Sequence, residues 1–219
     1  MIKAIAFDMD GVLFDTERIS KSTWTQVGKE WGLPGVENLL NRAMGLNYED
    51  TRTLLSEKYG KDFPYDDFRT RCSEIFDEEL SKEGLPMKPG VVEILSYLKE
   101  ANIPVALSTS TRRVKTIAHL KEAGIENYFK VVVTGDTVKH SKPNPEIYCN
   151  TCRALGTAPQ ETIAVEDSPN GLQSARRAGM FVVMIPDQVA PTKELEPFYD
   201  QVFESLVCLK DWFCTDAFQ

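Results

Sequence analysis

The chain has 219 residues, enough to bury a substantial core in one or two domains. Its 42% hydrophobic and 26% charged residues are ordinary for a globular protein that folds in water. The formal net charge of -8 argues against a nucleic-acid partner and against docking on an anionic membrane surface, because both need a basic face.

The chain offers no sign of export or membrane insertion. Its first residues form an apolar stretch too short for a signal peptide, and no stretch approaches the roughly 20 apolar residues of a spanning helix. The five cysteines lack the spacing of a disulfide framework. Cys149 and Cys152 form a CxxC inside a helical pattern, which favours a reduced structural pair, with redox or metal use as alternatives. We expect a cytoplasmic monomer.

Short apolar runs rich in β-branched residues alternate with helical patterns along the chain. Helices are expected to start at Asn144-Pro145 and Ser168-Pro169, and to end at Gly124, Gly156 and Gly179. This alternation is typical of an α/β fold, a Rossmann-like, doubly wound parallel sheet covered on both faces. The runs expected as strands are residues 2–7, 103–107, 131–133, 162–165 and 181–185.

One interval, residues 16–86, contains helical patterns but no convincing strand. About 70 residues are far too many for a loop in a compact domain. We therefore predict a helical domain at residues 16–86, inserted into a core made of residues 1–15 and 87–219. Hinges are expected near Asp15-Thr16 and near residues 85–90. The last dozen residues, with Trp212 and Phe213, predict a docked terminal helix.

Polar side chains follow each of the first four expected strands. Each group has an ordinary explanation by itself: a turn, a helix cap or a solvated lysine. Together, on successive strand ends, they are hard to explain as separate caps, because the carboxyl ends of parallel strands are where ligands bind. The groups are Asp8 and Asp10, then Ser108 and Thr109, then Lys142, then Glu166 and Asp167.

Phosphate-ester chemistry gives these groups a common purpose. A carboxylate that attacks a phosphate ester needs its charge repulsion cancelled, and Mg²⁺ held by carboxylate oxygens such as those of Asp8 and Asp167 does this. Lys142 could neutralise a phosphoryl oxygen, and a hydroxyl with backbone N–H groups at Ser108 could hold the others. Asp10 could then act as acid to the leaving alkoxide and as base to water.

Four stretches, in this order and spacing, resemble the haloacid dehalogenase superfamily. The chain looks like the branch with a helical cap after the first strand, which includes β-phosphoglucomutases and many sugar-phosphate phosphatases. The resemblance covers essentially the whole chain, and the set is far more specific than any single member. The stretches are FDMDGVLFDTE (7–17), LSTS (107–110), SKPNPEIY (141–148) and VEDSPNG (165–171).

The resemblance implies a role for each of these residues. It implies that Asp8 becomes a transient aspartyl-phosphate, and that Asp10 supplies acid–base catalysis and a backbone carbonyl to Mg²⁺. It also implies that the helical insert is a cap that opens and closes over a small phosphorylated metabolite. Phosphate would be held by Ser108, Thr109 and Lys142, and the metal by Asp8, Asp10, Glu166 and Asp167.

The family contains several chemistries, and the sequence favours a phosphatase. Expelling a halide needs no proton, so an acid at Asp10 favours phosphate esters over haloalkanes. The resemblance also implies that a β-phosphoglucomutase would carry a histidine in place of Ser20 and an arginine near Tyr48. Neither is present here, so a phosphatase is favoured and a hexose phosphomutase is the alternative. Substrate choice is expected to come from insert residues, each of which could equally be core or surface, with the core favoured for Trp24 and Met44. They are Thr16, Ser20, Trp24, Arg42 and Met44.

Three other classes fit the sequence less well. A receiver-type signalling domain also forms an aspartyl-phosphate, but it keeps the acceptor on a middle strand and lacks a helical insert. A dinucleotide oxidoreductase would need a GxGxxG turn after the first strand, where this chain has Asp10-Gly11. A binding protein that retains the fold without catalysis would not need every catalytic residue type to be present.

Overall fold

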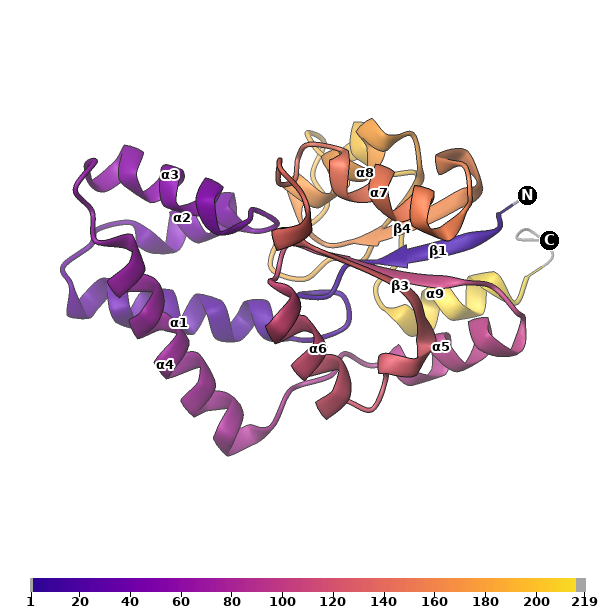
Figure 1. The fold of residues 1–219 in the computed structure, drawn as a ribbon, viewed down its shortest axis with the longest axis horizontal. Helices are drawn as coiled ribbons and strands as arrows, with labels where there is room; N and C mark the ends of the chain where they lie inside the picture. Colours follow the sequence, from indigo (N-terminus) through magenta and orange to yellow (C-terminus); the bar gives the residue numbers. More distant parts are fainter. Residues whose placement is uncertain (1, 216–219) are drawn as a thin grey trace.

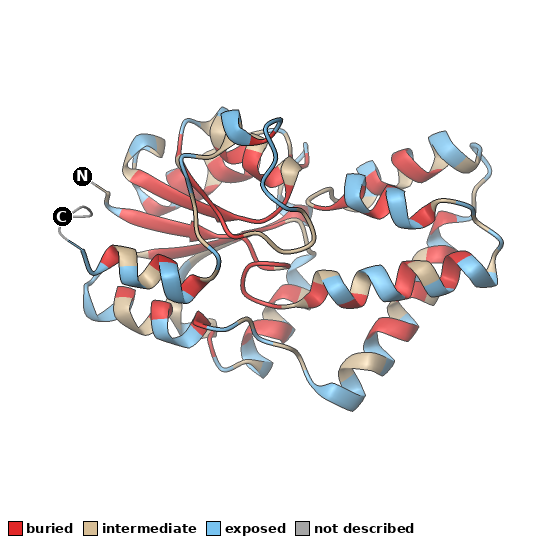
Figure 2. Cartoon of the chain, turned by 180° about the vertical axis from the view of Figure 1, so that it is seen from behind, coloured by how far each residue is buried: buried red, intermediate tan, exposed pale blue. Residues whose placement is uncertain are grey.

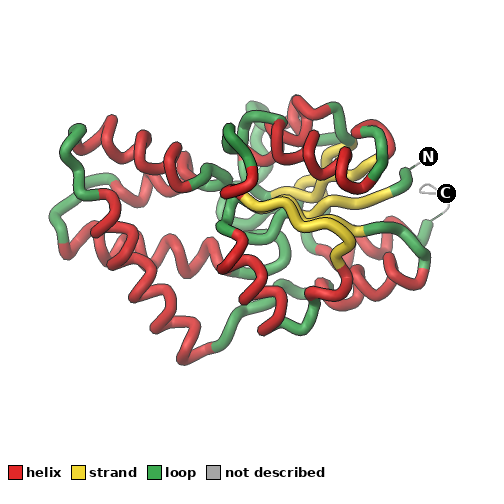
Figure 3. Tube along the Cα trace, viewed as in Figure 1, coloured by secondary structure: helices red, strands yellow, loops and turns green. Residues whose placement is uncertain are grey.

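The computed structural model describes residues 2–215 and has an α/β fold built on one sheet. All six strands of this described part run parallel, in the order β3-β2-β1-β4-β5-β6, and the helices pack around them (Figures 1 and 3). This confirms the expected doubly wound sheet. The strands are β1 (Ala4–Phe7), β2 (Val105–Thr109), β3 (Phe129–Thr134), β4 (Thr162–Glu166), β5 (Phe181–Met184) and β6 (Gln201–Val202).

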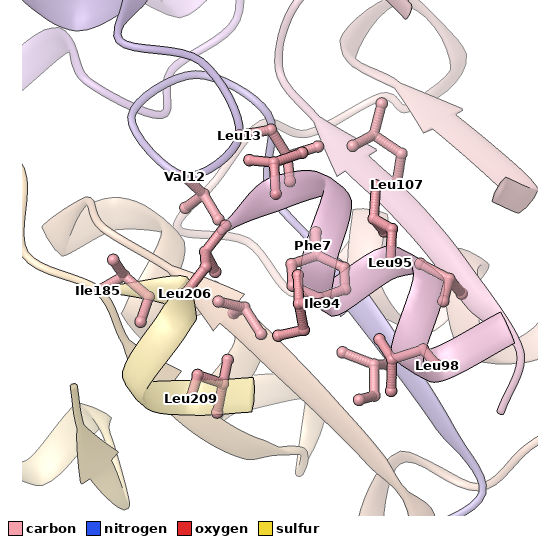
Figure 4. Close-up of a cluster of buried hydrophobic side chains, with 14 of the residues drawn as sticks. Phe7, Val12, Leu13, Ile94, Leu95, Leu98, Leu107, Ile185, Leu206 and Leu209 are labelled. Atoms are coloured by element: carbon pink, nitrogen blue, oxygen red, sulfur yellow. The ribbon is translucent and has the colours of Figure 1, made fainter. Parts of the chain in front are cut away.

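The two faces of β1 differ in side-chain size, which sets what packs on each. Successive residues of a strand point to opposite faces. Ile5 and Phe7 join the larger hydrophobic cluster, with side chains from α5 (Val91–Glu100) and α9 (Leu206–Phe213) (Figure 4). Ala6 lies in register with Ala106 and Ala164 on the other face, where small side chains let a helix approach the sheet closely.

Helices cover both faces of the sheet and leave its strands buried (Figure 2). The face of Phe7 is covered by α5, α9 and α6 (Arg113–Glu122), whose Leu120 lies in the same cluster. The alanine face is covered by α7 (Glu146–Leu155) and α8 (Pro169–Ala178), with Tyr148 and Leu172 buried against it. The terminal helix α9 docks through Phe213, which is 1% exposed. The buried strands β1, β2, β4 and β5 therefore form a rigid base for the groups at their carboxyl ends.

Between β1 and α5 the chain makes four consecutive helices that lie to one side of the sheet (Figure 1). They share a hydrophobic cluster that is separate from the two clusters on the sheet, with Trp24 packed edge-on against Phe68 at a centroid distance of 5.3 Å. A separate core explains how the interval can fold without a strand. The helices are α1 (Thr16–Glu30), α2 (Val36–Ala43), α3 (Tyr48–Tyr59) and α4 (Tyr65–Glu83).

Two linkers that run side by side connect these helices to the sheet. The Asp15 N–H donates to the Pro86 carbonyl at 2.8 Å, and the Lys88 N–H donates to the Leu13 carbonyl at 2.9 Å. Phe14 and Met87 form the bridge between them, in antiparallel sense. The chain thus leaves and re-enters the core at one point, where the sequence predicts hinges.

The structure adds details that the apolar pattern does not reveal. β6 is a two-residue strand without an apolar run, and the sequence gives no signal for it. β3 starts two residues earlier and β2 ends two residues later than expected, so Thr109 and Thr134 close their strands. Cys149 and Cys152 are free and lie within α7. Within residues 2–215, every helix is too short or too polar to cross a membrane.

Candidate active site

Asp8 lies directly beyond the carboxyl end of β1, the strand with neighbours on both sides at the centre of the sheet. Its backbone N–H donates to the Val165 carbonyl of β4 at 2.9 Å, which extends the ladder by one residue. The residue is only 6% exposed and lines a cavity of about 560 Å³. A carboxylate fixed this way can attack a group bound in the cavity without prior rearrangement.

Lys142 fills the space between the two acidic strand ends. Its Nζ donates to Asp8 Oδ1 at 2.7 Å, to Glu166 Oε1 at 2.6 Å and to the Ser108 carbonyl at 3.1 Å. The residue is 1% exposed, so an ammonium at this depth needs all three acceptors. Burial alone would lower the pKa of Lys142, but the charges of Asp8 and Glu166 raise it above its ordinary value. The lysine therefore remains charged.

Glu166, the last residue of β4, is fully buried and hydrogen-bonded at both oxygens. Oε1 also accepts from the Tyr148 hydroxyl at 2.6 Å, while Oε2 accepts from the Asp167 N–H and the Ser168 hydroxyl, both at 3.3 Å. A Cβ on Gly171 would lie 2.0 Å from Glu166 Oε2, so α8 can pack this closely only with a glycine there. Glu166 thus holds Lys142 in place.

Asp167 differs from Glu166, because both of its carboxylate oxygens are buried and have no hydrogen-bond partner among the described residues. Gly11 lies against it: its φ is +85°, and an added Cβ would lie 2.2 Å from Asp167 Oδ2. Oxygens of Asp8, Glu166 and Asp167 lie within 4.8 Å of one another. Unpaired carboxylate oxygens in such a cluster are the ligands that Mg²⁺ prefers, so the residues present fit this ion.

The charges of this cluster do not balance. Burial raises the pKa of Asp8 to about 8, with Glu166 and Asp10 adding to the shift and Lys142 opposing it. Burial and the charges of Glu166 and Asp8 also raise the pKa of Asp167 well above its usual range. One ammonium therefore serves three buried carboxyls, and a bound divalent cation would supply the missing positive charge.

Asp10 is held by two hydroxyls that come from different parts of the chain. Thr16 Oγ1, at the start of α1, donates to Asp10 Oδ1 at 2.6 Å. Thr111 Oγ1, which follows β2, donates to Asp10 Oδ2 at 2.7 Å. Asp10 also lines the cavity, so its carboxyl is oriented toward the space in which Asp8 would react.

The two hydroxyl residues that end β2 face opposite ways. Ser108 is fully buried, and its hydroxyl lies 2.7 Å from that of Thr151 in α7, away from the cavity. Thr109, the next residue, lines the cavity, and its Oγ1 accepts from the Thr111 N–H at 3.1 Å. The expectation that the Ser108 hydroxyl holds phosphate therefore does not fit this placement. The period of two along a strand gives the position facing the cavity to Thr109.

The structure separates the five residues that were expected to choose the substrate. Ser20, Trp24 and Met44 line the cavity, with Trp24 and Met44 also buried. Thr16 does not line it and instead contacts Asp10. Arg42 is exposed on α2 and is not among the residues that line the cavity, contrary to the expectation.

Four further residues that surround these groups were not assigned to the site from the sequence. Tyr148 and Thr111 complete the hydrogen bonds of Glu166 and Asp10, and Glu17 and Arg69 line the cavity. Glu17 carried a usable signal, because it lies three and seven residues before Ser20 and Trp24, on one face of a helix. The other three depend on which helices and loops meet in space.

Known proteins resemble this chain over most of its length. The family model described as "Haloacid dehalogenase-like hydrolase" matches residues 5–185. A phosphorylated carbohydrates phosphatase of Thermotoga maritima is 35% identical over 179 residues, which covers 82% of each chain. A β-phosphoglucomutase of Bacillus subtilis is 27% identical over 190 residues, covering 83% of this chain and 82% of that one.

Solved structures show the same architecture. The crystal structure of CbbY from Rhodobacter sphaeroides in complex with phosphate matches with a TM-score of 0.75 and 27% identity. The match covers 95% of this chain and 96% of that one, so it includes the helices between β1 and α5.

Proposed function

We propose, from the premise that this chain belongs to the haloacid dehalogenase-like hydrolase family, that it is a Mg²⁺-dependent phosphatase of small sugar or related metabolite phosphates. One observation carries the proposal. Asp8 borders the cavity at the centre of the sheet, with the Lys142 ammonium 2.7 Å from one of its oxygens and the unpaired oxygens of Asp167 close by. This arrangement suits a carboxylate that attacks an anionic ester.

The proposed reaction has two steps. Asp8 attacks the phosphorus atom, the bond between phosphorus and the ester oxygen breaks, and Asp10 gives its proton to the leaving alkoxide. Asp10 then takes a proton from water as the water oxygen attacks the phosphorus of the aspartyl-phosphate. Inorganic phosphate leaves, Asp8 is restored and Asp10 regains its proton.

The residues proposed to hold Mg²⁺ are Asp8, Asp167 and the backbone carbonyl of Asp10. Glu166 stands behind them, because its oxygens already accept from Lys142 and Tyr148. When bound, Mg²⁺ would offset the repulsion between the nucleophile and the phosphate. Lys142, Thr109 and backbone N–H groups after β2 would hold phosphate oxygens.

Residues 16–86 would serve as the cap over this site. The loop between α2 and α3 supports the idea, because it meets the core at two places. The Ser110 hydroxyl donates to the Gly45 carbonyl at 2.6 Å, and Asn170 Nδ2 donates to the Met44 carbonyl at 2.7 Å. Elsewhere the Ser141 hydroxyl donates to Asp50 of α3, and Lys115 Nζ lies 3.9 Å from Asp77 Oδ1 of α4. Breaking these polar contacts would let the cap open for substrate and product, and closing it would exclude bulk water.

A β-phosphoglucomutase-type hexose phosphomutase would use the same core and is the alternative. The relative from Bacillus subtilis that bears this name supports it. Against it, Ser20 and Tyr48 line the cavity where the mutases are expected to carry histidine and arginine. Arg52 lies 5.4 Å from the centroid of the Tyr48 ring, but its guanidinium is already bonded to Asp66 at 2.6 Å. The phosphatase is therefore the function we propose.

The test is phosphate release from a panel of sugar and polyol phosphates with Mg²⁺, alongside Asp8→Asn. Turnover of several monophosphates that is absent in Asp8→Asn and absent with a chelator would support the proposal. A separate arm supplies β-glucose 1-phosphate with glucose 1,6-bisphosphate. Formation of glucose 6-phosphate with little free phosphate would instead establish the mutase. The cytoplasmic location and the monomeric state stay predictions of the sequence.

A further inference from the structure

One cationic and one acidic side chain line the cavity beside Asp8 without a side-chain hydrogen bond or ion pair to any other described residue. Arg69 on α4 makes no side-chain hydrogen bond or ion pair there, and its Nε is buried without a partner. Glu17 on α1 likewise makes no side-chain hydrogen bond or ion pair among the described residues. The buried Nε of Arg69 is costly to leave without a hydrogen bond, so a ligand that accepts from it is expected in the cavity, beside Glu17.

The other cations around the cavity already have partners. Lys142 is bound to Asp8 and Glu166. Lys115 lies 3.8 Å from the Phe76 ring centroid, and Arg112 lies 4.3 Å from that of Tyr48. Among the cavity cations of residues 2–215, Arg69 is thus the one that makes neither an ion pair nor a contact with an aromatic ring.

Glu17 and Arg69 face the same space without closing on each other. Their charges are near enough for Arg69 to lower the pKa of the Glu17 carboxyl. Even so, they do not form an ion pair within 4.0 Å. The two groups come from different helices that pack together, α1 and α4. Because both side chains line the same cavity, a ligand there that carries both acceptors and donors can contact each of them.

Further residues on the same faces of α1 and α4 also line the cavity. Glu17 and Ser20 lie on one face of α1, and Arg69 and Ser73 lie on one face of α4. The next positions on both faces are aromatic, with Trp24 and Phe76 lining the cavity. The cavity thus has polar groups near the reacting carboxylates and aromatic side chains beyond them. Such a lining suits a ligand with a chain or ring of carbons that bear hydroxyls.

We infer that Glu17 and Arg69 together recognise hydroxyl groups of the substrate's leaving group, so that the substrate is a phosphate monoester of a polyhydroxylated, otherwise uncharged carbon skeleton. The inference rests on the proposed phosphatase function and adds to it the residues that select the alcohol. A hydroxyl donates to the Glu17 carboxyl and accepts from the Arg69 guanidinium, which satisfies both groups with one ligand class.

The charges of the cavity argue against a second anion on the substrate. A carboxylate or second phosphate bound by Arg69 would share the cavity with the phosphate group of the ester itself, and two anions in one cavity repel each other. Burial, together with the charges of Asp10 and Asp8, raises the pKa of Glu17 to about 8. Near neutral pH its carboxyl can therefore donate as well as accept, which suits a hydroxyl.

Three phosphate esters of six carbons provide the test with Mg²⁺. Sorbitol 6-phosphate carries hydroxyls only, n-hexyl phosphate carries none, and 6-phosphogluconate adds a carboxylate. We expect Glu17→Gln and Arg69→Gln each to lower the ratio of kcat/KM for sorbitol 6-phosphate to that for n-hexyl phosphate by about 10- to 100-fold, the effect of a hydrogen bond to a charged group. Arg69→Lys should keep part of this ratio.

The matched controls are Glu37→Gln and Arg42→Gln, which make the same changes at exposed positions of α2 outside the cavity. They should leave the ratio at its wild-type value. An equal loss on all three esters in the Glu17 or Arg69 variants would mean a structural role and would overturn the inference.

Two further results would also overturn it. If the Arg69 variants lose turnover of 6-phosphogluconate alone, Arg69 recognises an anion rather than hydroxyls. If the wild type hydrolyses n-hexyl phosphate as well as sorbitol 6-phosphate, the phosphatase proposal stands and the hydroxyl recognition fails. Hydrolysis of none of the esters would refute the phosphatase proposal itself.

Discussion

The Thr16 hydroxyl, on the first residue of α1, donates a hydrogen bond of 2.6 Å to Asp10 Oδ1. The helix that leads into the proposed cap is thereby tied to the proposed general acid. Because the other Asp10 oxygen accepts from Thr111 after β2, the orientation of this acid depends on both sides of the hinge. Any movement of α1 relative to the sheet would change the position of the Asp10 carboxyl.

We expect Thr16→Val to lower kcat by about 10-fold with a smaller change in KM, because a hydrogen bond to a carboxylate is worth roughly 1.5–3 kcal/mol and this one orients a reacting group. Steady-state kinetics on any hydrolysed ester would measure it. Thr25→Val is the matched control, because the Thr25 hydroxyl bonds only to the Lys21 carbonyl of its own helix. Equal losses in the two variants would argue against the orienting role.

Replacing Lys142 should affect stability as well as activity. Lys142→Met would leave Asp8 and Glu166 buried without their ammonium, and removing one partner of a buried ion pair costs about 3–5 kcal/mol of unfolding free energy. Urea denaturation would measure this change, and Lys139→Met, three residues away and exposed, is the control. A loss under about 1 kcal/mol would mean that the carboxyls are neutral without the lysine.

Stability without metal should fall as pH rises. Folding raises the pKa of Asp8 from 3.8, and that of Glu17 from 4.5, to about 8, because burial disfavours the charged form. Between these values the folded state binds more protons than the unfolded state, so the unfolding free energy decreases with increasing pH. Chemical denaturation in a chelator across this range would measure the slope.

Mg²⁺ should reverse this trend, because it binds ionised carboxylates and so stabilises the folded protein more at the alkaline end of the same range. Repeating the denaturation with Mg²⁺ gives the comparison. Asp8→Asn removes one of the carboxyls and should make the slope in chelator shallower. A stability that is independent of pH in chelator would contradict the assigned charges.

Gly45 should matter for cap closure. Its φ is +80°, and an added Cβ would lie 2.9 Å from Ser168 Oγ and 3.2 Å from Asn170 Cβ, both in the core. We expect Gly45→Ala to lower kcat/KM by about 10-fold or more, because the loop can no longer approach the start of α8. Kinetics and thermal denaturation would be measured together.

Gly32 provides the control for that substitution. It also has a positive φ, +64°, but an added Cβ would meet nothing within 4 Å. Gly32→Ala should therefore cost only the backbone strain, about 1 kcal/mol, and keep kcat/KM close to that of the wild type. If both variants lose activity equally, backbone strain rather than the contact with the core is responsible.

The sheet and the acidic residues at its edge could be predicted from local sequence patterns. Five apolar runs became five of the strands, because buried parallel strands need continuous apolar residues. Asp8, Glu166 and Asp167 were found because they lie at the ends of β1 and β4, and Lys142 because it lies in the loop that follows β3. Parallel strands bring such positions to one edge whatever the details of packing. Local signals are sufficient for features of this kind.

The packed fold was needed to learn which of two neighbouring side chains faces the cavity and which groups from distant segments lie around it. Ser108 and Thr109 both carry a hydroxyl, so residue type alone does not distinguish them. The end of β2 places the Ser108 side chain toward α7 and the Thr109 side chain toward the cavity. Glu17 and Arg69 are about fifty residues apart and meet only through the packing of α1 on α4. Contacts between distant segments depend on helix orientation and side-chain packing, for which no local pattern exists.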